Sequence, residues 1–140
     1  MNRKMKQEKL AKQISLALMA GMVTYTPVAF GMPVQDTAKA PTTGVNIQDD
    51  IPIGMGITST AENNVIYWTD FSIEAGKTVK FDYDADNPDA VVKNHNYANI
   101  VTGAATSFIN GAMEGGKNVY LINPNGVIFG KDAQVNVGNL

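Results

Sequence analysis

Residues 118–137, NVYLINPNGVIFGKDAQVNV, decide the fold class of this chain. Apolar residues in this stretch form pairs separated by one residue, and each pair begins eight residues after the preceding pair. The pairs are Val119 and Leu121, Val127 and Phe129, and Val135 and Val137. Side chains at positions i and i+2 share one face of a strand, and five intervening residues suffice for a corner but not for a helical crossover. The spacing therefore predicts short strands joined by tight corners.

The same spacing occurs further upstream, where Phe71 and Ile73 are followed eight residues later by Val79 and Phe81. In addition, GKTVKF at 76–81 is similar to GKNVYL at 116–121, and a looser third copy begins at residue 130. Each copy has a glycine turn, a lysine and a strand with alternating side chains. We interpret the copies as units of one repeated architecture, in which the ten paired apolar residues face inward.

Two all-β architectures fit such strands. The strands can meander as antiparallel hairpins, or each can form one side of a coil that stacks on the coil below it, which is a parallel β-helix. Hairpins with two-residue loops favour Asn-Gly or Asp-Gly between longer strands, whereas this chain has Asn-Gly only within NPNG and at Asn110-Gly111. The pattern favours the β-helix.

The NPNG corner consists of Asn123, Pro124, Asn125 and Gly126. Proline presets φ at the second position of a β-turn, and asparagine and glycine suit the third and fourth positions. Asparagine side chains at such corners can also bond to backbone groups that short strands leave unpaired. The corner is therefore predicted to be a rigid turn with contacts to its stacked neighbour.

The first 31 residues differ in character from the rest of the chain. A basic segment precedes the apolar residues 14–23, which are too few to span a bilayer but suit a secretory signal peptide. Ala29 and Gly31 occupy the positions preferred for cleavage before Met32. The sequence thus predicts a signal peptide at 1–31 that directs the chain to the general export machinery. Its basic residues are Arg3, Lys4, Lys6, Lys9 and Lys12.

The charge that remains after residue 31 limits the function classes. Residues 32–140 contain 6 basic and 12 acidic residues, so this part of the chain is negatively charged. Phosphate backbones and anionic membrane surfaces repel such a surface, which argues against nucleic-acid binding and membrane-surface binding. The chain has no cysteine, so its stability must come from the packed core.

Residues 32–57 are mixed in Pro, Gly, Thr and Asp and show neither helical nor strand periodicity. We therefore expect a linker that leads into an N-terminal cap. Residues 58–140 contain the β-branched and aromatic segments, and we expect the β-helical domain there.

Two segments within 58–140 carry a resemblance to a known family. NVYLINPNGVIFGKDAQVNVGNL at 118–140 resembles the N-terminal secretion (TPS) domain of two-partner-secretion exoproteins, the filamentous haemagglutinin family. VIYWTDFSIEAGKTVKF at 65–81 is similar to the opening strands of that domain, and the two segments occur in the family's order.

The resemblance implies a right-handed parallel β-helix with an N-terminal cap and no active site, metal or cofactor. It also implies that an outer-membrane β-barrel transporter with POTRA domains recognises the domain in the periplasm. The exoprotein would then be secreted, or held at the cell surface, by a Gram-negative bacterium. Its passenger, an adhesin or contact-dependent toxin carrier, would bind a host or neighbouring cell, and the domain would seed the folding of that passenger.

The chain departs from the family pattern in two ways. Family members are usually much longer than 140 residues, so we expect a fragment or truncated product. We also expect marginal stability of the isolated chain, because the stacking would end with an uncovered coil at Leu140. Where the family often has a second motif, NPNL, this chain has NHNYANI at 94–100. Two alternatives stay open, namely a β-helical surface enzyme acting on polysaccharide and a structural or adhesive β-solenoid of another secretion class.

The remaining candidate sites have simpler interpretations. Asp82, Asp84, Asp86 and Asp89 alternate as in a calcium loop, but Asn87 replaces the required glycine and Lys93 replaces the terminal glutamate. A solvated acidic loop is the favoured interpretation, although ion binding stays open. His95 is the only histidine, and we expect a loop residue without catalytic function. The chain is predicted not to be an enzyme.

Overall fold

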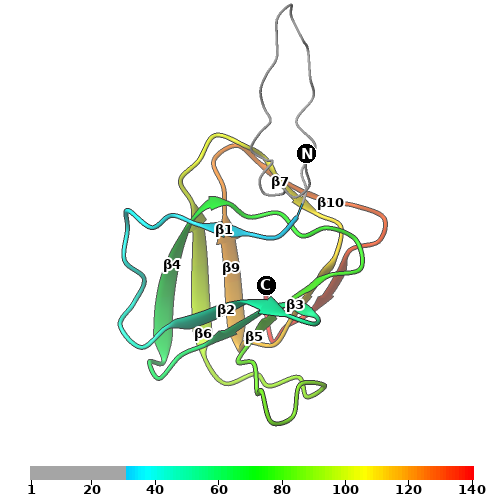
Figure 1. The fold of residues 1–140 in the computed structure, drawn as a ribbon. Coiled ribbons are helices and arrows are strands. Elements are labelled where there is room, and N and C mark those ends of the chain that lie inside the picture. The colour runs from blue at the N-terminus through cyan, green and yellow to red at the C-terminus, as the bar shows by residue number, and fades with distance from the viewer. Residues whose placement is uncertain (1–30) are drawn as a thin grey trace, which may run out of the picture.

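The computed structural model describes residues 31–140, and this part of the chain is all-β, with eleven strands and no helix (Figure 1). The predicted signal peptide falls almost wholly on residues 1–30, so it lies outside the described residues. The same holds for its basic residues Arg3, Lys4, Lys6, Lys9 and Lys12. Residues 31–140 contain no helix that is long and apolar enough to cross a membrane.

The strands form three sheets. Sheet A has the order β1-β4-β6-β9, with bounds Val34–Gln35, Asn63–Asp70, Asn96–Val101 and Asn118–Ile122. Sheet B has the order β11-β8-β5-β3-β2, with bounds Gln134–Asn136, Ala112–Glu114, Thr78–Phe81, Gly54–Thr58 and Asn46–Ile51. Sheet C pairs β10 (Val127–Phe129) with β7 (Ser107–Ile109).

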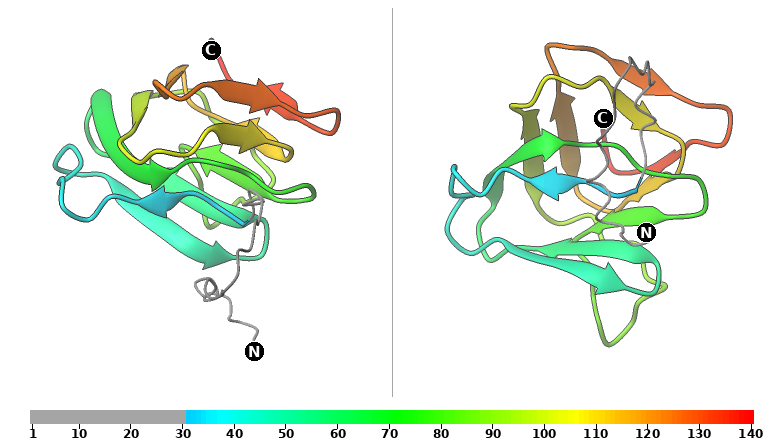
Figure 2. Two further views of the ribbon diagram at one scale, coloured as in Figure 1. Left: turned by 90° about the horizontal axis from the view of Figure 1, so that it is seen from above. Right: turned by 45° about the horizontal axis from the view of Figure 1, so that its top comes forward.

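The chain visits the three sheets in turn, so that segments distant in sequence lie side by side (Figure 2). We call residues 63–81 coil 1, residues 96–114 coil 2 and residues 118–136 coil 3. Every strand pair between these coils is parallel, namely β4 with β6, β6 with β9, β7 with β10, β5 with β8 and β8 with β11. This arrangement is consistent with a β-solenoid.

The eight-residue spacing of the sequence is the length of one side of a coil. Val119 and Leu121 lie in β9 of sheet A, and Val127 and Phe129 lie in β10 of sheet C. Val135 lies in β11 of sheet B, and Val137 follows that strand directly. Each apolar pair therefore belongs to a different sheet. The pairs recur without intervening hairpins because the chain turns a corner from one sheet to the next after each pair.

The core lies between the sheets and is stacked in columns. In sheet B, Met55, Val79 and Met113 occupy equivalent positions on neighbouring strands and are buried. Their column continues to Val135 in coil 3, which is 42% exposed. Parallel in-register pairing superimposes side chains of the same face, so the column gives a continuous apolar interior.

The ten residues predicted to face inward differ in burial according to their coil. Five are buried, three are half-buried against the core, and two are exposed. The buried residues are Phe71, Ile73, Val79, Phe81 and Val119, and the half-buried ones are Leu121, Val127 and Val137. Phe129 and Val135 are 46% and 42% exposed although they align with buried Ile109 and Met113. Their exposure arises because no described strand pairs with the outer side of β10 or β11.

Residues 32–57 differ from the linker that their sequence pattern predicted, because they contain β1, β2 and most of β3. β2 and β3 form an antiparallel hairpin, and β3 pairs with β5 in parallel. From Gly54 to Ile57 every residue of β3 is buried. Neither face of this part of the strand is exposed to solvent, so its sequence lacks the alternation of apolar and polar residues by which strands are usually recognised. A Cβ at Gly56 would lie 2.6 Å from the Tyr83 ring, which explains why this strand has so little side-chain bulk.

Candidate functional site

The NPNG corner joins β9 to β10 through a turn with internal hydrogen bonds. The Asn125 backbone N–H donates to the Asn123 side-chain oxygen over 2.8 Å, and the Gly126 N–H donates to the Asn123 carbonyl over 2.9 Å. Gly126 has φ +99°, a backbone conformation that other residues rarely adopt. Asparagine, proline and glycine thus each meet a geometric requirement of this corner.

The corner also bonds to the preceding corner of the stack, at residues 103–107. The Asn123 amide donates to the Ala105 carbonyl and to the Ser107 hydroxyl, both over 2.9 Å. The Asn125 amide donates to the Gly103 carbonyl over 3.0 Å. Both asparagine amides therefore hold coil 3 on coil 2. The first role of the motif is thus structural, because it connects two neighbouring coils by hydrogen bonds.

The corner and the strands beside it expose both polar and apolar groups, since Asn125 and Gly126 are exposed along with Pro124. On either side of the corner, Ile122 and Ile128 are 49% and 51% exposed.

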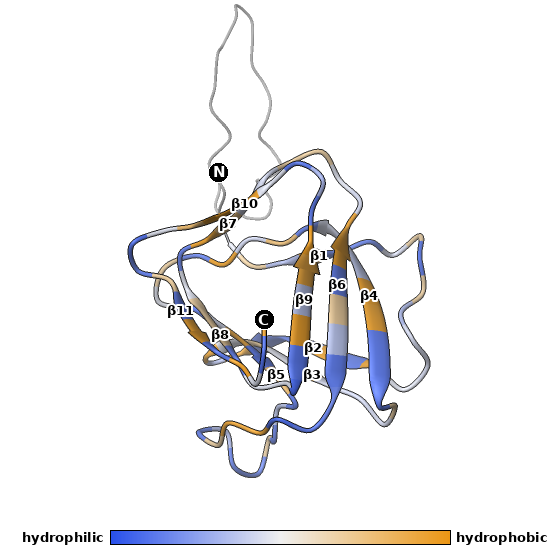
Figure 3. Ribbon diagram, turned by 180° about the vertical axis from the view of Figure 1, so that it is seen from behind, coloured by the Kyte–Doolittle hydropathy of each residue, from blue (hydrophilic) through white to orange (hydrophobic). Residues whose placement is uncertain are grey.

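A ladder of four asparagines lies at the other end of sheet A. The amide of Asn96 donates to the side-chain oxygen of Asn63 over 2.7 Å, and that of Asn118 donates to Asn96 over 2.8 Å. Asn139 continues the ladder by donating to Asn118 over 2.9 Å. In Figure 3 the hydrophilic ends of β4, β6 and β9, where three of these residues lie, stand side by side. The ladder fixes the register of successive coils.

Asp82 anchors the acidic loop to the core. Its Oδ2 accepts hydrogen bonds from the backbone N–H groups of Asn94 and His95, over 2.7 and 2.9 Å. Its Oδ1 accepts from His95 Nδ1 over 2.7 Å and from the Tyr97 hydroxyl over 2.8 Å. Asp82 is buried and has φ +56°, so the interpretation as a solvated acidic loop is wrong for this residue.

The rest of the acidic loop is exposed at Asp84, Asp86 and Asp89. Residues 31–140 contain no group of three or more acidic or histidine side chains placed to hold a metal ion. Lys80 also holds the loop in place, because its ammonium group donates a hydrogen bond to the Pro88 carbonyl over 2.6 Å. The same ammonium group pairs with Glu114 at 3.2 Å.

Burial raises the pKa of the Tyr97 hydroxyl, and the hydrogen bond to Asp82 and the charge of its carboxylate raise it further. The tyrosine therefore stays protonated in the folded chain and remains a donor to Asp82. Burial likewise raises the pKa of Asp70, although a hydrogen bond from the Ser72 hydroxyl acts against this shift.

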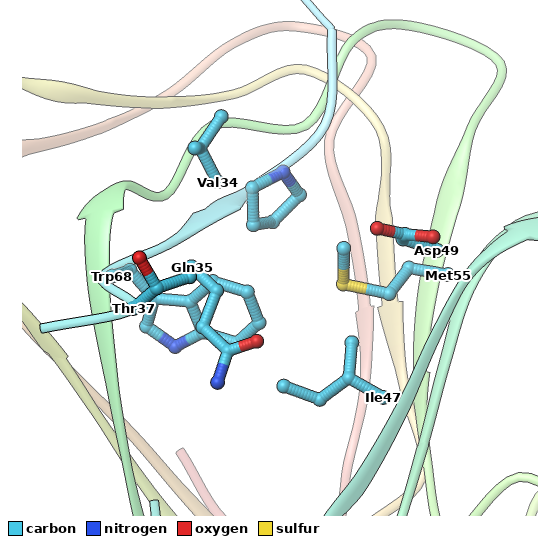
Figure 4. A pocket seen from close by; sticks show the side chains of 8 residues that line it. Val34, Gln35, Thr37, Ile47, Asp49, Met55 and Trp68 are labelled. Carbon is cyan, nitrogen blue, oxygen red and sulfur yellow. The ribbon is translucent and has the colours of Figure 1, made fainter. Parts of the chain in front are cut away.

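A hollow at the N-terminal end of the core lies between β1 and β2 (Figure 4). Its volume is about 320 Å³. Trp68, Met55 and Ile47 supply apolar walls, and the polar groups of Gln35, Thr37 and Asp49 lie around them. The residues that line it are Pro33, Val34, Gln35, Thr37, Ile47, Asp49, Met55 and Trp68. We call this hollow the cap cavity.

Comparison with known proteins identifies the class to which this fold and its NPNG corner belong. A family model described as "TPS secretion domain" matches residues 32–140. The chain belongs to this family and is a secretion domain of a two-partner-secretion exoprotein. The match includes the cap strands β1 to β3, so the family relationship extends upstream of the segments that carried the resemblance in sequence.

Two curated relatives are named "Heme/hemopexin-binding protein" and come from Haemophilus influenzae. One, from strain Rd, is 38% identical over 86 residues, which is 61% of this chain. The other is 35% identical over 96 residues, which is 69% of this chain. The matched parts are only 9% and 10% of the relatives' lengths, so this chain corresponds to about a tenth of each.

Membership in this family indicates where in the cell the protein is found. Exoproteins of this class are secreted across the outer membrane of Gram-negative bacteria, so the chain is a secreted or cell-surface protein. Neither the family description nor the names of the relatives denote an enzyme.

Proposed function

We propose that this chain is the recognition module through which an outer-membrane TpsB-type transporter selects its exoprotein for export. The family match over residues 32–140 carries the proposal. The transporter would expose POTRA domains in the periplasm, and domains of that kind bind ligands by adding an extended strand to a sheet edge. Among the described strands, β2 lies at the edge of sheet B and pairs on one side only, which supports such pairing.

The proposed module is a right-handed parallel β-helix closed at its N-terminal end by β1, β2 and β3. The parallel pairing of every strand between coils supports this architecture. Parallel strand–crossover–strand connections are right-handed almost without exception, which supports the handedness. Residues 1–31 would act as the cleaved signal peptide, and residues 32–57 as the cap that precedes the helix.

The NPNG corner, with Asn123, Pro124, Asn125 and Gly126, would serve the module by holding coil 3 in register. The inward-facing residues would seed the stacking of the passenger. The passenger would be an adhesin, a contact-dependent toxin carrier or, as the names of the two relatives suggest, a protein that binds haem or hemopexin. It would act at a host or neighbouring-cell surface.

Deletion of the transporter gene tests this function. The secreted chain and a soluble periplasmic marker protein are measured by immunoblot in the medium and in the periplasm. We expect the chain to accumulate in the periplasm of the deletion strain, while the marker stays periplasmic in both strains. Unchanged release into the medium without marker leakage would refute the proposal. It would favour a solenoid of another secretion class.

A further inference from the structure

β2 is the outermost strand of sheet B and pairs with β3 alone among the described strands. One side of β2 therefore presents backbone donors and acceptors without strand partners. The opposite end of the stack is different, because Asn139 already pairs with Asn118 on the outer side of β9. The chain itself continues the coil at that end, whereas no strand within residues 31–140 covers the outer edge of β2.

The β2 edge carries two acidic side chains at a bulge. Gln48 lies opposite Gly56 and Ile51 lies opposite Gly54, so β2 has one residue more than β3 between these two pairs. Asp49 and Asp50 occupy the bulge, and both are exposed. Bulges and charges on edge strands discourage indiscriminate strand pairing. An incoming strand with positive charge would relieve this repulsion, whereas a neutral or acidic strand would not.

The cap cavity lies directly beside this edge, because Ile47 and Asp49 of β2 contribute to its lining. Its volume of about 320 Å³ is at the lower end of the range for ligand pockets, which suits one large side chain better than a cofactor. Trp68 and Met55 provide a rigid apolar floor, since both are buried in the core. A strand paired with β2 could place one apolar side chain in the cavity.

We infer that the β2 edge and the cap cavity together bind an extended strand that carries lysine or arginine and one large apolar residue. The cationic groups face Asp49 and Asp50, and the apolar residue enters the cavity over Trp68. Backbone pairing supplies affinity in such complexes, and the side-chain pockets supply specificity. The inference rests on the proposed function, since the strand belongs to the periplasmic part of the transporter.

Binding of the full 140-residue chain to the purified periplasmic region of its transporter tests the inference. The double variant Asp49→Asn/Asp50→Asn is compared with Asp84→Asn/Asp86→Asn, which removes the same charge from the exposed acidic loop. We expect the β2 variant to bind at least about tenfold more weakly, with slower association and a smaller dependence on salt. The loop variant should bind within about twofold of the unmodified chain, because rim charges distant from the contact contribute little.

A second pair of variants tests the cavity without changing charge. Gln35→Trp places a large ring at the cavity, and Gln134→Trp places the same ring on the distant strand β11. We expect faster dissociation for Gln35→Trp only. Thermal melts of all variants establish that they fold, and hydrogen exchange in the complex shows which strand gains protection.

The outcomes separate the inference from the proposed function. Absence of any binding by the unmodified chain would refute recognition by the transporter. Binding that Asp49→Asn/Asp50→Asn and Gln35→Trp leave unchanged would overturn the inference while the proposed function stands. Protection of β9 or β10 in place of β2 would overturn it as well, and would place the contact at coil 3.

Discussion

The side-chain amide of Asn118 donates a hydrogen bond to the side-chain oxygen of Asn96 over 2.8 Å, although the residues are 22 positions apart. Asn96 in turn donates to Asn63, which is 33 positions upstream. The ladder therefore stays continuous although the two steps differ in length. The longer step contains the acidic loop, which leaves the stack after Asp82. The end of the loop is held to its beginning, because the backbone N–H groups of Asn94 and His95 donate to the Asp82 carboxylate.

Replacement of Asn96 by alanine should destabilise the stack. Asn96 is the donor to Asn63 and the acceptor from Asn118, so the substitution removes one exposed hydrogen bond and leaves the half-buried amide of Asn118 without its acceptor. We expect the free energy of unfolding to fall by about 1–2 kcal/mol, measured by urea denaturation. Asn87→Ala, in the exposed loop, is the control and should change it by less than about 0.5 kcal/mol. Equal effects of the two substitutions would show that the ladder is not a stabilising feature.

The NPNG corner should respond to substitution in a definite order. Asn123→Ala removes three hydrogen bonds, two of them to the preceding corner, and should cost about 2–3 kcal/mol. Gly126→Ala forces alanine to adopt φ +99°, at about 1–2 kcal/mol, although no atom blocks its Cβ closely. Pro124→Ala mainly increases the conformational entropy of the unfolded chain and should lower the free energy of unfolding by about 0.4–1 kcal/mol. Urea denaturation measures all three, and a larger loss for Pro124→Ala than for Asn123→Ala would contradict this account of the corner.

Asp82→Asn should loosen the acidic loop. Both carboxylate oxygens of Asp82 accept from two donors, so an amide nitrogen at either position would face donors and find no acceptor. Asparagine tolerates the positive φ of this residue, which limits the effect to the lost hydrogen bonds. We expect a loss of about 2–4 kcal/mol in unfolding free energy and faster amide hydrogen exchange over residues 82–95. His95→Gln removes one side-chain donor and should have a smaller effect, and unchanged exchange in Asp82→Asn would refute the anchoring role.

The repeated side of the coil was predictable because its cause is local. Val119, Val127 and Val135 recur every eight residues since each begins the inward face of one side. The NPNG corner was predictable for the same reason, because proline and glycine have narrow backbone preferences. Gly76 and Gly116, by contrast, precede strands of different sheets, so their similar segments share a local turn with positive φ and not a position in the coil.

The features that the sequence did not reveal depend on contacts between distant segments. β3 is buried from Gly54 to Ile57 against β2, β5 and Tyr83, which removes the alternation by which a strand is recognised. The asparagine ladder has unequal steps because the acidic loop interrupts the first one. Asp82 looks like its exposed neighbours in sequence, and only its position against His95 and Tyr97 distinguishes it.

Coil 3 should open more readily than coil 2. In coil 2, β6 and β8 have a strand neighbour on both sides, whereas described strands cover β9 and β11 of coil 3 on one side only. In stacked repeats, stability is largely a sum of contacts between neighbours, so outer repeats fray first. We expect amides of β9 and β11 to exchange faster than those of β6 and β8, measured by hydrogen exchange with mass spectrometry. Uniform protection across both coils, or a cooperative melt of the isolated chain at high temperature, would contradict the expected marginal stability.

The buried hydroxyl of Tyr97 should make the chain sensitive to alkali. Burial, and next the hydrogen bond to Asp82, raise the pKa of this hydroxyl above its ordinary value of 10.0 in the folded state. The unfolded chain therefore loses this proton first as the pH rises. The contribution of Tyr97 to stability is complete below pH 10 and falls above it, by up to about 1.4 kcal/mol per pH unit. Tyr97→Phe loses one hydrogen bond at neutral pH but lacks the ionisable group. Urea denaturation at several pH values should therefore show the unmodified chain losing its advantage over the variant above pH 10, and parallel curves for the two proteins would refute the burial of this hydroxyl against Asp82.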